Sequence, residues 1–370
     1  MNFTFSDHEK NLFQNMESAL AQEKHLFVKG AFQAENDIAQ ALITFKQKLS
    51  SLGYFSSFNH SSSLEPVATL EMMRIFARQH PALFLGVEYG FRIVTEINRM
   101  LNESCLQSSQ VDDSLVCAIA FCEDFVETDT KQSSINVQSV DDYFLLSGEK
   151  NVVINAGVAK YIAVYGHIDG KDTLFFISAS DDSLDLVPIE NKRFFPELAI
   201  ANIVLRNCQV PQNMVLYPQQ LNALISKVQY LENFACIACA LGMIDKCIEI
   251  TTGFAKTHQS GNKPLIAHQA VAFSLAETVT LKQTAELLAY RAAWMCATDD
   301  SEKIVMNQCA KVFCSEAAET IASQCINILG GQVFMDNHLV EQMLFNAKFL
   351  QLIGTSTHLA RIAIADVALK

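Results

Sequence analysis

The sequence predicts an α+β protein with an N-terminal helical domain, a middle antiparallel β-barrel domain and a C-terminal four-helix-bundle domain. Helical periodicity runs to about residue 110, short β-rich runs follow to about residue 215, and long helical segments fill the remainder. We therefore expect domains at residues 1–114, 115–217 and 218–370. With 370 residues, 50% of them hydrophobic, the chain is long enough to bury a large core.

The N-terminal region carries apolar residues at the spacing of amphipathic helices. Two stretches show this spacing: Val67, Leu70, Met73, Ile75 and Phe76, and then Ile93, Val94, Ile97 and Met100. Gly53 and the Ser/Asn-rich segment 56–63 predict a loop between helices.

The middle region is rich in β-branched and aromatic residues arranged in short runs. Seven candidate strands are separated by Asp, Gly and Ser turns: 116–121, 143–146, 152–154, 161–165, 173–177, 184–187 and 201–205. Runs this closely spaced leave no room for crossover helices, so they favour an antiparallel barrel or sandwich.

The C-terminal region returns to the helical period in long segments. Its breaks fall near residues 260–264, 299–301 and 330–337, which is the pattern of an antiparallel helix bundle.

Charge and composition exclude several classes of protein. The net charge of −13 argues against nucleic acid or an anionic membrane surface as the main partner. No run of about 18 apolar residues predicts a transmembrane span, and the first residues do not resemble a signal peptide. Eleven scattered cysteines fit reduced thiols, so we expect a cytoplasmic protein. The pair Cys236 and Cys239 has metal-like spacing without a second pair nearby, and we predict no metal site.

The last 45 residues carry the most informative pattern. They contain Leu329-Gly330-Gly331, Val340-Glu341, Ala347-Lys348, Gly354-Thr355-Ser356 and Arg361. This order and spacing resembles the C-terminal signature of the acyl-CoA dehydrogenase family. Further stretches lie on family motifs in register: 120–129, 148–155, 210–216, 241–242, 268–270, 275–277 and 291–294. The resemblance covers most of the chain and implies the same three-part fold, an FAD cofactor and oxidation of an acyl thioester.

The glutamate that acts as the base in most of this family is missing. The family's usual Glu-Gly-Thr block is preceded here by Ile353 instead of Glu, and an alignment without gaps from Gly330 to Arg361 places Gly354 at the base position. A minority of the family carries the base on a helix earlier in the chain, and the corresponding residue here is Glu232. The alternative for a lone helical Glu is a solvated surface residue, but Phe234, Ala235 and Cys236 make this helix apolar. We predict that Glu232 is the catalytic base.

The resemblance also implies the cofactor and substrate contacts. Phe121, Cys122, Val152 and Ile154 would pack on the flavin, although Cys122 replaces a Thr hydroxyl and the second motif has lost its aromatic and hydroxyl groups. A neighbouring subunit would contribute His258, which replaces an Arg, together with Asn327, Gly330 and Gly331; His258 and the two glycines are equally compatible with helix ends. Ser356 and His358, or Thr355 and Ser356 under the alignment that places Gly354 at the base position, would meet the adenosine end of FAD. Thr128 and Asn233, the latter replacing the family's Arg, would contact the substrate.

Three hypotheses remain open on the sequence. The first is an acyl-CoA or acyl-carrier-protein dehydrogenase that uses Glu232 and passes electrons to an acceptor such as an electron-transfer flavoprotein. The second is a catalytically degenerate subunit that completes the site of a hetero-oligomer. The third is a flavoprotein of the same fold that oxidises a substrate other than a thioester. The resemblance implies a homodimer or homotetramer, and we expect neither nucleic acid nor a membrane as a partner.

Overall fold

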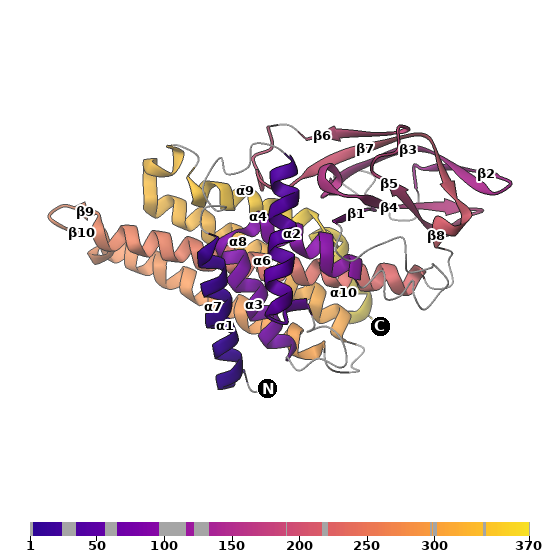
Figure 1. Ribbon diagram of the computed structural model, residues 1–370. Coiled ribbons are helices and arrows are strands. Elements are labelled where there is room, and N and C mark those ends of the chain that lie inside the picture. Colours follow the sequence, from indigo (N-terminus) through magenta and orange to yellow (C-terminus); the bar gives the residue numbers. More distant parts are fainter. Residues whose placement is uncertain are drawn as a thin grey trace.

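The computed structural model describes residues 3–23, 35–55, 65–95, 116–121, 133–189, 191–216, 221–296, 298, 302–335 and 338–369. Within these residues a helical N-terminal region, a region of two sheets and a long helical C-terminal region follow one another (Figure 1). The predicted α+β fold class is confirmed. The exact domain boundaries stay predictions.

The N-terminal region contains four α-helices and one π-helical turn within the described residues. These are α1 (Asp7–Gln22), α2 (Glu35–Ser51), α3 (Pro66–Gln79), α4 (Pro81–Val87) and η3 (Glu88–Arg92). Ser6 starts α1 with a capping box to Glu9, while Pro66 and Pro81 occupy the first positions of α3 and α4. Helix α3 is buried along most of its length because it packs on the C-terminal bundle.

The middle region forms two four-stranded sheets, ordered β1-β4-β5-β8 and β2-β3-β7-β6. The strands are β1 (Cys117–Ala120), β2 (Asn136–Val140), β3 (Tyr143–Ile154), β4 (Tyr161–Ile168), β5 (Lys171–Ser178), β6 (Leu184–Pro188), β7 (Ile200–Pro211) and β8 (Val215–Leu216). The expectation of a closed barrel is corrected, because the described strands form two separate sheets, which correspond to the sandwich alternative. The sheets are also not wholly antiparallel, since β1 pairs with β4 in parallel.

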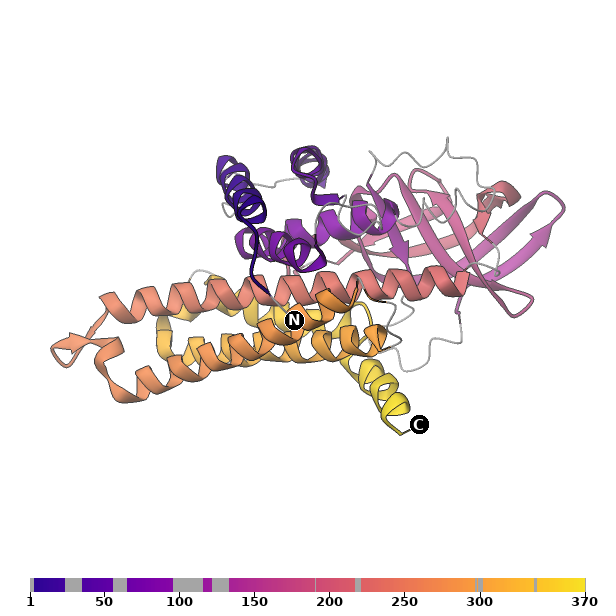
Figure 2. The ribbon, with the colours of Figure 1, turned by 90° about the horizontal axis from the view of Figure 1, so that it is seen from below.

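The C-terminal region is built around helix α6 (Leu221–Thr257), which runs along its whole length (Figure 2). The N-terminal helices lie on one side of α6, the remaining bundle helices lie on the other, and the sheets lie at its N-terminal end (Figure 2). A short hairpin of β9 (Gln259–Ser260) and β10 (Lys263–Pro264) follows, and then come α7 (Gln269–Met295), α8 (Lys303–Leu329), α9 (Leu339–Leu352) and α10 (Thr357–Ala368). The sequence breaks near residues 260–264 and 330–337 correspond to this hairpin and to the 3₁₀ turn Gly330–Phe334.

Two apolar clusters form the core. The larger one joins the N-terminal helices to the bundle and reaches the inner ends of the strands, while the smaller one lies between the two sheets. In the described part of the chain, no helix combines the length and the apolar character needed to cross a membrane.

Candidate active site

Glu232 lies on α6 among apolar neighbours. Its side chain is buried, with 9% exposure, and Phe234, Ala235 and Cys236 beside it are almost fully buried. A carboxylate in such surroundings loses hydration, which disfavours its charged form. Burial raises the pKa of Glu232 to about 8, although the positive charge of Lys311 acts in the opposite direction. The polar residue that sequence analysis selected is therefore an enclosed acid and not a solvated surface group.

The turn that follows α9 packs directly against Glu232. Gly354 begins it with a φ of +64°, a left-handed conformation that favours glycine. A Cβ added to Gly354 would lie 3.4 Å from the Cβ of Glu232 and 2.8 Å from Oδ1 of Asn233. Two positions that are 122 residues apart in sequence, 232 and 354, thus meet in space at one point.

Asn233 holds this turn in place through a reciprocal pair of hydrogen bonds. The backbone N–H of Thr355 donates to Oδ1 of Asn233 at 2.9 Å, and Nδ2 of Asn233 donates to Oγ1 of Thr355 at 3.1 Å. The Asn233 side chain is 2% exposed, so both ends of its amide are engaged inside the protein. In this structure Asn233 links α6 to the turn, and its contact with the substrate stays a prediction.

Lys311 on α8 is a charged group that sequence analysis missed. It is fully buried, and Nζ donates a hydrogen bond to the backbone carbonyl of Gln351 in the last turn of α9 at 3.1 Å. Burial lowers the pKa of Lys311 to about 8, against the opposing effects of Cys236 and Glu232. In the sequence Lys311 stands alone between Ala310 and Val312, a pattern that is equally typical of a lysine whose ammonium group extends to solvent.

The residues predicted to face the flavin lie on the β region. Phe121 follows β1, packs edge-on against Tyr165 and accepts a hydrogen bond from Lys150 Nζ through its carbonyl at 3.3 Å. Val152 lies at an irregularity of β3 with a φ of +56°, and its N–H donates to Asn202 Oδ1 at 3.0 Å. Ile154, at the end of β3, is buried. Lys150 thus brings Phe121 next to the strand that carries the other two residues.

Two residues predicted to contact FAD, Ser356 and His358, lie at the start of α10. Ser356 is the N-cap of α10, where its hydroxyl accepts the N–H of Leu359 at 3.3 Å. His358 is exposed in the first turn of that helix. Cys122 and Thr128 lie outside the described residues.

His258, Asn327, Gly330 and Gly331 lie far from Glu232 within one chain. About 38 Å of helix separates Glu232 from the end of α6 at Thr257, and His258 follows there with its ring stacked on Phe254. Asn327 is exposed near the end of α8, and Gly330 follows that end with a φ of +64°. A single chain therefore cannot bring these residues and Glu232 to the same ligand group.

The chemical capacity of the site follows from its buried acid. A carboxyl whose pKa lies near neutrality is a competent proton acceptor at physiological pH, and the apolar walls around it exclude competing water. Among the described residues, no group of three or more His, Cys, Asp or Glu side chains could hold a metal ion. Cys236 and Cys239 are free and buried on α6.

Comparison with known proteins gives the site its context. Residues 225–369 match the family model for the C-terminal domain of acyl-CoA dehydrogenases. The mitochondrial short-chain specific acyl-CoA dehydrogenase of Sus scrofa is 24% identical over 249 residues, which span 66% of this chain and 60% of that protein. The 3-(aryl)acrylate reductase of Clostridium sporogenes is 24% identical over 263 residues, 68% of each chain.

The solved structures agree in fold over the full length. Butyryl-CoA dehydrogenase from Megasphaera elsdenii superposes with a TM-score of 0.85 at 16% identity, covering 100% of both chains. The prolyl acyl carrier protein oxidase AnaB gives a TM-score of 0.81 at 17% identity, covering 99% of this chain and 100% of that one. Residues 225–369 thus match the C-terminal domain of acyl-CoA dehydrogenases, and the whole chain shares the fold of a solved acyl-CoA dehydrogenase.

Proposed function

We propose that this protein is a flavin-dependent α,β-dehydrogenase of acyl thioesters in which Glu232 removes the proton from the α-carbon. The substrate is an acyl group carried by coenzyme A or by an acyl carrier protein, since relatives and structural neighbours are named for both kinds of carrier. The observation that supports this most directly is the contact between Glu232 and Gly354. The Cβ of Glu232 on α6 thus lies beside the turn from which the family resemblance expects a base.

The environment of Glu232 suits proton abstraction from a weakly acidic carbon. Burial raises the pKa of Glu232 to about 8, which makes its anion a stronger base than an exposed glutamate. The carboxylate takes the α-proton, while Asn233 and Thr355 keep the adjoining turn fixed, so that the base stays oriented toward the reacting carbon.

The residues on the β region fit a flavin. Phe121 and Val152 are half-buried and Ile154 is buried, so they offer apolar side chains on which an isoalloxazine ring can pack. FAD, when bound, supplies the acceptor for the hydride that leaves the β-carbon. Cys122 would join these side chains, Thr128 would contact the thioester, and Thr355, Ser356 and His358 would lie toward the adenosine end.

A second copy of the chain would complete the cofactor site. His258, Asn327, Gly330 and Gly331 cannot reach the Glu232 region of their own chain, because long stretches of helix separate them from it. A homodimer or homotetramer would let these residues contact the FAD of a neighbour. Reoxidation of the cofactor would then need an external acceptor such as an electron-transfer flavoprotein.

The test is an anaerobic reduction followed by visible absorbance. The purified protein, loaded with FAD, should lose its flavin absorbance on addition of a suitable acyl-CoA or acyl-carrier-protein thioester. Glu232→Gln should slow this bleaching by about 10³-fold or more, because the base is lost, while the flavin spectrum in the absence of substrate is unchanged. Ser315→Ala, a small buried change on α8, serves as the control and should bleach at the wild-type rate.

Three outcomes would contradict the proposal. Normal bleaching by Glu232→Gln would remove Glu232 from the role of base. A protein that takes up no FAD alone but becomes active with a partner chain would favour a degenerate subunit of a hetero-oligomer. Oxygen consumption that needs no thioester would instead point to another oxidation chemistry.

A further inference from the structure

Lys311 is unusual because its ammonium group lies wholly inside the helical bundle. Its side chain has no exposed surface, and its neighbours on α8 include the buried Ala310, Val312 and Cys314. Transferring a charged amine from water into such a place costs several kcal/mol unless other groups compensate. A fully buried Lys therefore needs a specific set of partners.

Two kinds of partner surround Lys311. The first is the end of α9, where Nζ bonds to the carbonyl of Gln351. Because the carbonyl end of a helix carries partial negative charge, a cation is stabilised there. The second is α6, where Glu232 and Cys236 both act electrostatically on Lys311. The same side chain thus faces both segments that form the Glu232 site.

The bond to Gln351 has a direct consequence for the site. Gln351 is three residues before Gly354, and Gly354 and Thr355 pack on Glu232 and Asn233. Tying Gln351 to α8 therefore limits the movement of the turn from one side, while Asn233 limits it from the other. The turn that adjoins the carboxylate is held at both ends.

We propose that Lys311 is a positioning residue for the base: it anchors the end of α9 beneath Glu232 and keeps a positive charge beside the carboxylate. The inference rests on the proposed function of Glu232 and adds the element that holds Glu232 in place and favours its anion. Lys311 does not itself touch the substrate in this scheme.

The other ionisable groups around Glu232 do not replace this charge. On α6, burial raises the pKa of Tyr230 and raises that of Cys236 to about 12, so both stay neutral near pH 7. On α8, Glu316 acts on Lys311, but it is also paired with Arg361 of α10 at 2.7 Å. The segment 351–356, which includes the turn after α9, contains no ionisable side chain. Lys311 is therefore the cation whose loss should change the ionisation of Glu232.

A simpler interpretation is that Lys311 only caps α9. The hydrogen bond to Gln351 would exist in either case, so loss of stability alone does not decide between them. The two interpretations differ in the pH at which folded Glu232 ionises. A cap leaves that pH unchanged, whereas a charge beside the carboxylate lowers it.

A stability cycle measures this pH without any need for turnover. The free energy of unfolding is measured from pH 5 to 10 for the FAD-loaded chain and for Glu232→Gln, each with Lys311 and with Lys311→Met. The stability gap between Glu and Gln grows with pH until folded Glu232 is ionised and then levels off. In the Lys311→Met pair we expect this plateau to begin about one pH unit higher, equivalent to a tenfold change in the proton affinity of Glu232.

Two further variants keep the test decisive. Lys311→Arg keeps a permanent positive charge and should move the plateau to lower pH, so it tests the inference even if Lys311→Met does not fold. Ser315→Ala, one turn further along α8, removes a buried hydroxyl that donates to the backbone carbonyls of Lys311 and Val312. It leaves the Lys311 ammonium group in place and should leave the plateau unchanged.

The outcomes separate this inference from the proposed function. A plateau at the same pH with Lys, Met and Arg at position 311 would overturn the role of Lys311, whatever the enzyme does. Normal bleaching by Glu232→Gln would overturn the proposed function even where the plateau moves. If both proposals hold, the acidic limb of the bleaching rate should shift upward with the plateau in Lys311→Met by about tenfold in proton concentration.

Discussion

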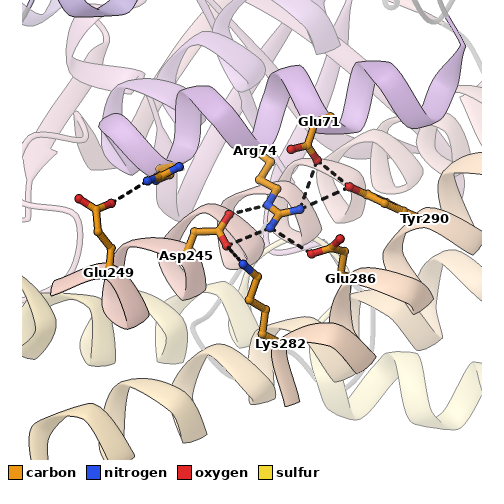
Figure 3. Close-up of polar contacts among 8 residues, drawn as sticks. Glu71, Arg74, Asp245, Glu249, Lys282, Glu286 and Tyr290 are labelled. Atoms are coloured by element: carbon orange, nitrogen blue, oxygen red, sulfur yellow. Dashed lines mark hydrogen bonds and ion pairs between the residues drawn. The ribbon is translucent and has the colours of Figure 1, made fainter. Parts of the chain in front are cut away.

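Two charge clusters among the described helices, one around Arg74 and one at Glu232 and Lys311, differ in how completely their charges are paired. In the first, the Arg74 cluster, Arg74 of α3 bonds to Asp245 of α6 at 2.5 and 2.9 Å and pairs with Glu71 and Glu286 (Figure 3). Lys282 of α7 adds a second cation on Asp245 at 2.7 Å, and Tyr290 donates to Glu71. Every charged group in this cluster has an opposite charge within ion-pair distance.

The Glu232–Lys311 pair is arranged differently. Among the described residues these two groups form no ion pair, and Lys311 bonds to a backbone carbonyl. Burial raises the pKa of Glu232 and lowers that of Lys311, each to about 8. In the Arg74 cluster, by contrast, burial would raise the pKa of Asp245, but hydrogen bonds from Arg74 and Lys282 hold it below its usual value.

The difference separates structural charges from reactive ones. Fully paired charges keep a fixed protonation state and fasten three helices together. A partly compensated charge stays close to the point at which it gains or loses a proton, and it does so at a cost in stability. Three changes test this distinction.

The largest expected effect is the loss of Arg74. Arg74→Met leaves Asp245, Glu71 and Glu286 partly buried near one another with Lys282 as their remaining cation. We expect the free energy of unfolding to fall by about 3–5 kcal/mol, as measured by urea titration. The bleaching rate per folded, FAD-loaded molecule should stay within about twofold of wild type, since Glu232 is not touched. An Arg74→Met protein that is as stable as wild type but bleaches slowly would instead assign the Arg74 cluster to the reaction and not to stability.

The intermediate effect is an increase in the free energy of unfolding, and we expect it for Glu232→Gln. Folded Glu232 keeps its proton up to a pKa of about 8, whereas the ordinary value is 4.5, so the folded state binds more protons between these pH values. Stability contributed by the protonated acid is therefore lost as pH rises through this window. Glu232→Gln cannot ionise, and we expect its free energy of unfolding to exceed that of wild type by roughly 2 kcal/mol at pH 6, with little difference at pH 4. Equal free energies of unfolding for Glu232→Gln and wild type across this pH range would show that burial does not raise the pKa of Glu232.

The smallest effect is expected at the surface, beside the Arg74 cluster. Glu249 pairs with Arg78 at 2.8 Å and with Lys246 at 3.0 Å, but its side chain is 46% exposed. Solvent screens such a pair, so Glu249→Gln should change the free energy of unfolding by less than about 1 kcal/mol. The same urea titration checks this, and a loss comparable to that of Arg74→Met would mean that exposure does not separate the two sites.

The fold is predictable from the sequence where local pattern and global fold agree. Strands β4 and β5 were predictable because apolar runs flank an Asp169-Gly170 turn, in which both residues have positive φ. Strand β2, residues 136–140, was missed because it is largely exposed and its sequence is polar. The parallel pairing of β1 with β4 was also not predicted, since strand composition does not reveal which strands become neighbours.

The site was predictable in part for the same reason. Glu232 stood out because it interrupts an apolar helix and because the base was missing elsewhere. Its contact with Gly354 depends on how α6 and α9 pack, which no local pattern encodes. The burial of Lys311 could not be predicted, because it depends on how α8 packs against the end of α9, 40 residues later in the chain.

The contact between positions 232 and 354 constrains how a family can move its base during evolution. A chain with glutamate at both positions would hold two carboxylates in one buried pocket, where their repulsion would keep one of them protonated. The second glutamate would also need the left-handed backbone at 354 to relax and Asn233 to give way. A chain that gains a glutamate at one of these positions before it loses the glutamate at the other is therefore disfavoured. A chain with no glutamate at either position, or with a neutral Gln at one of them, avoids this repulsion.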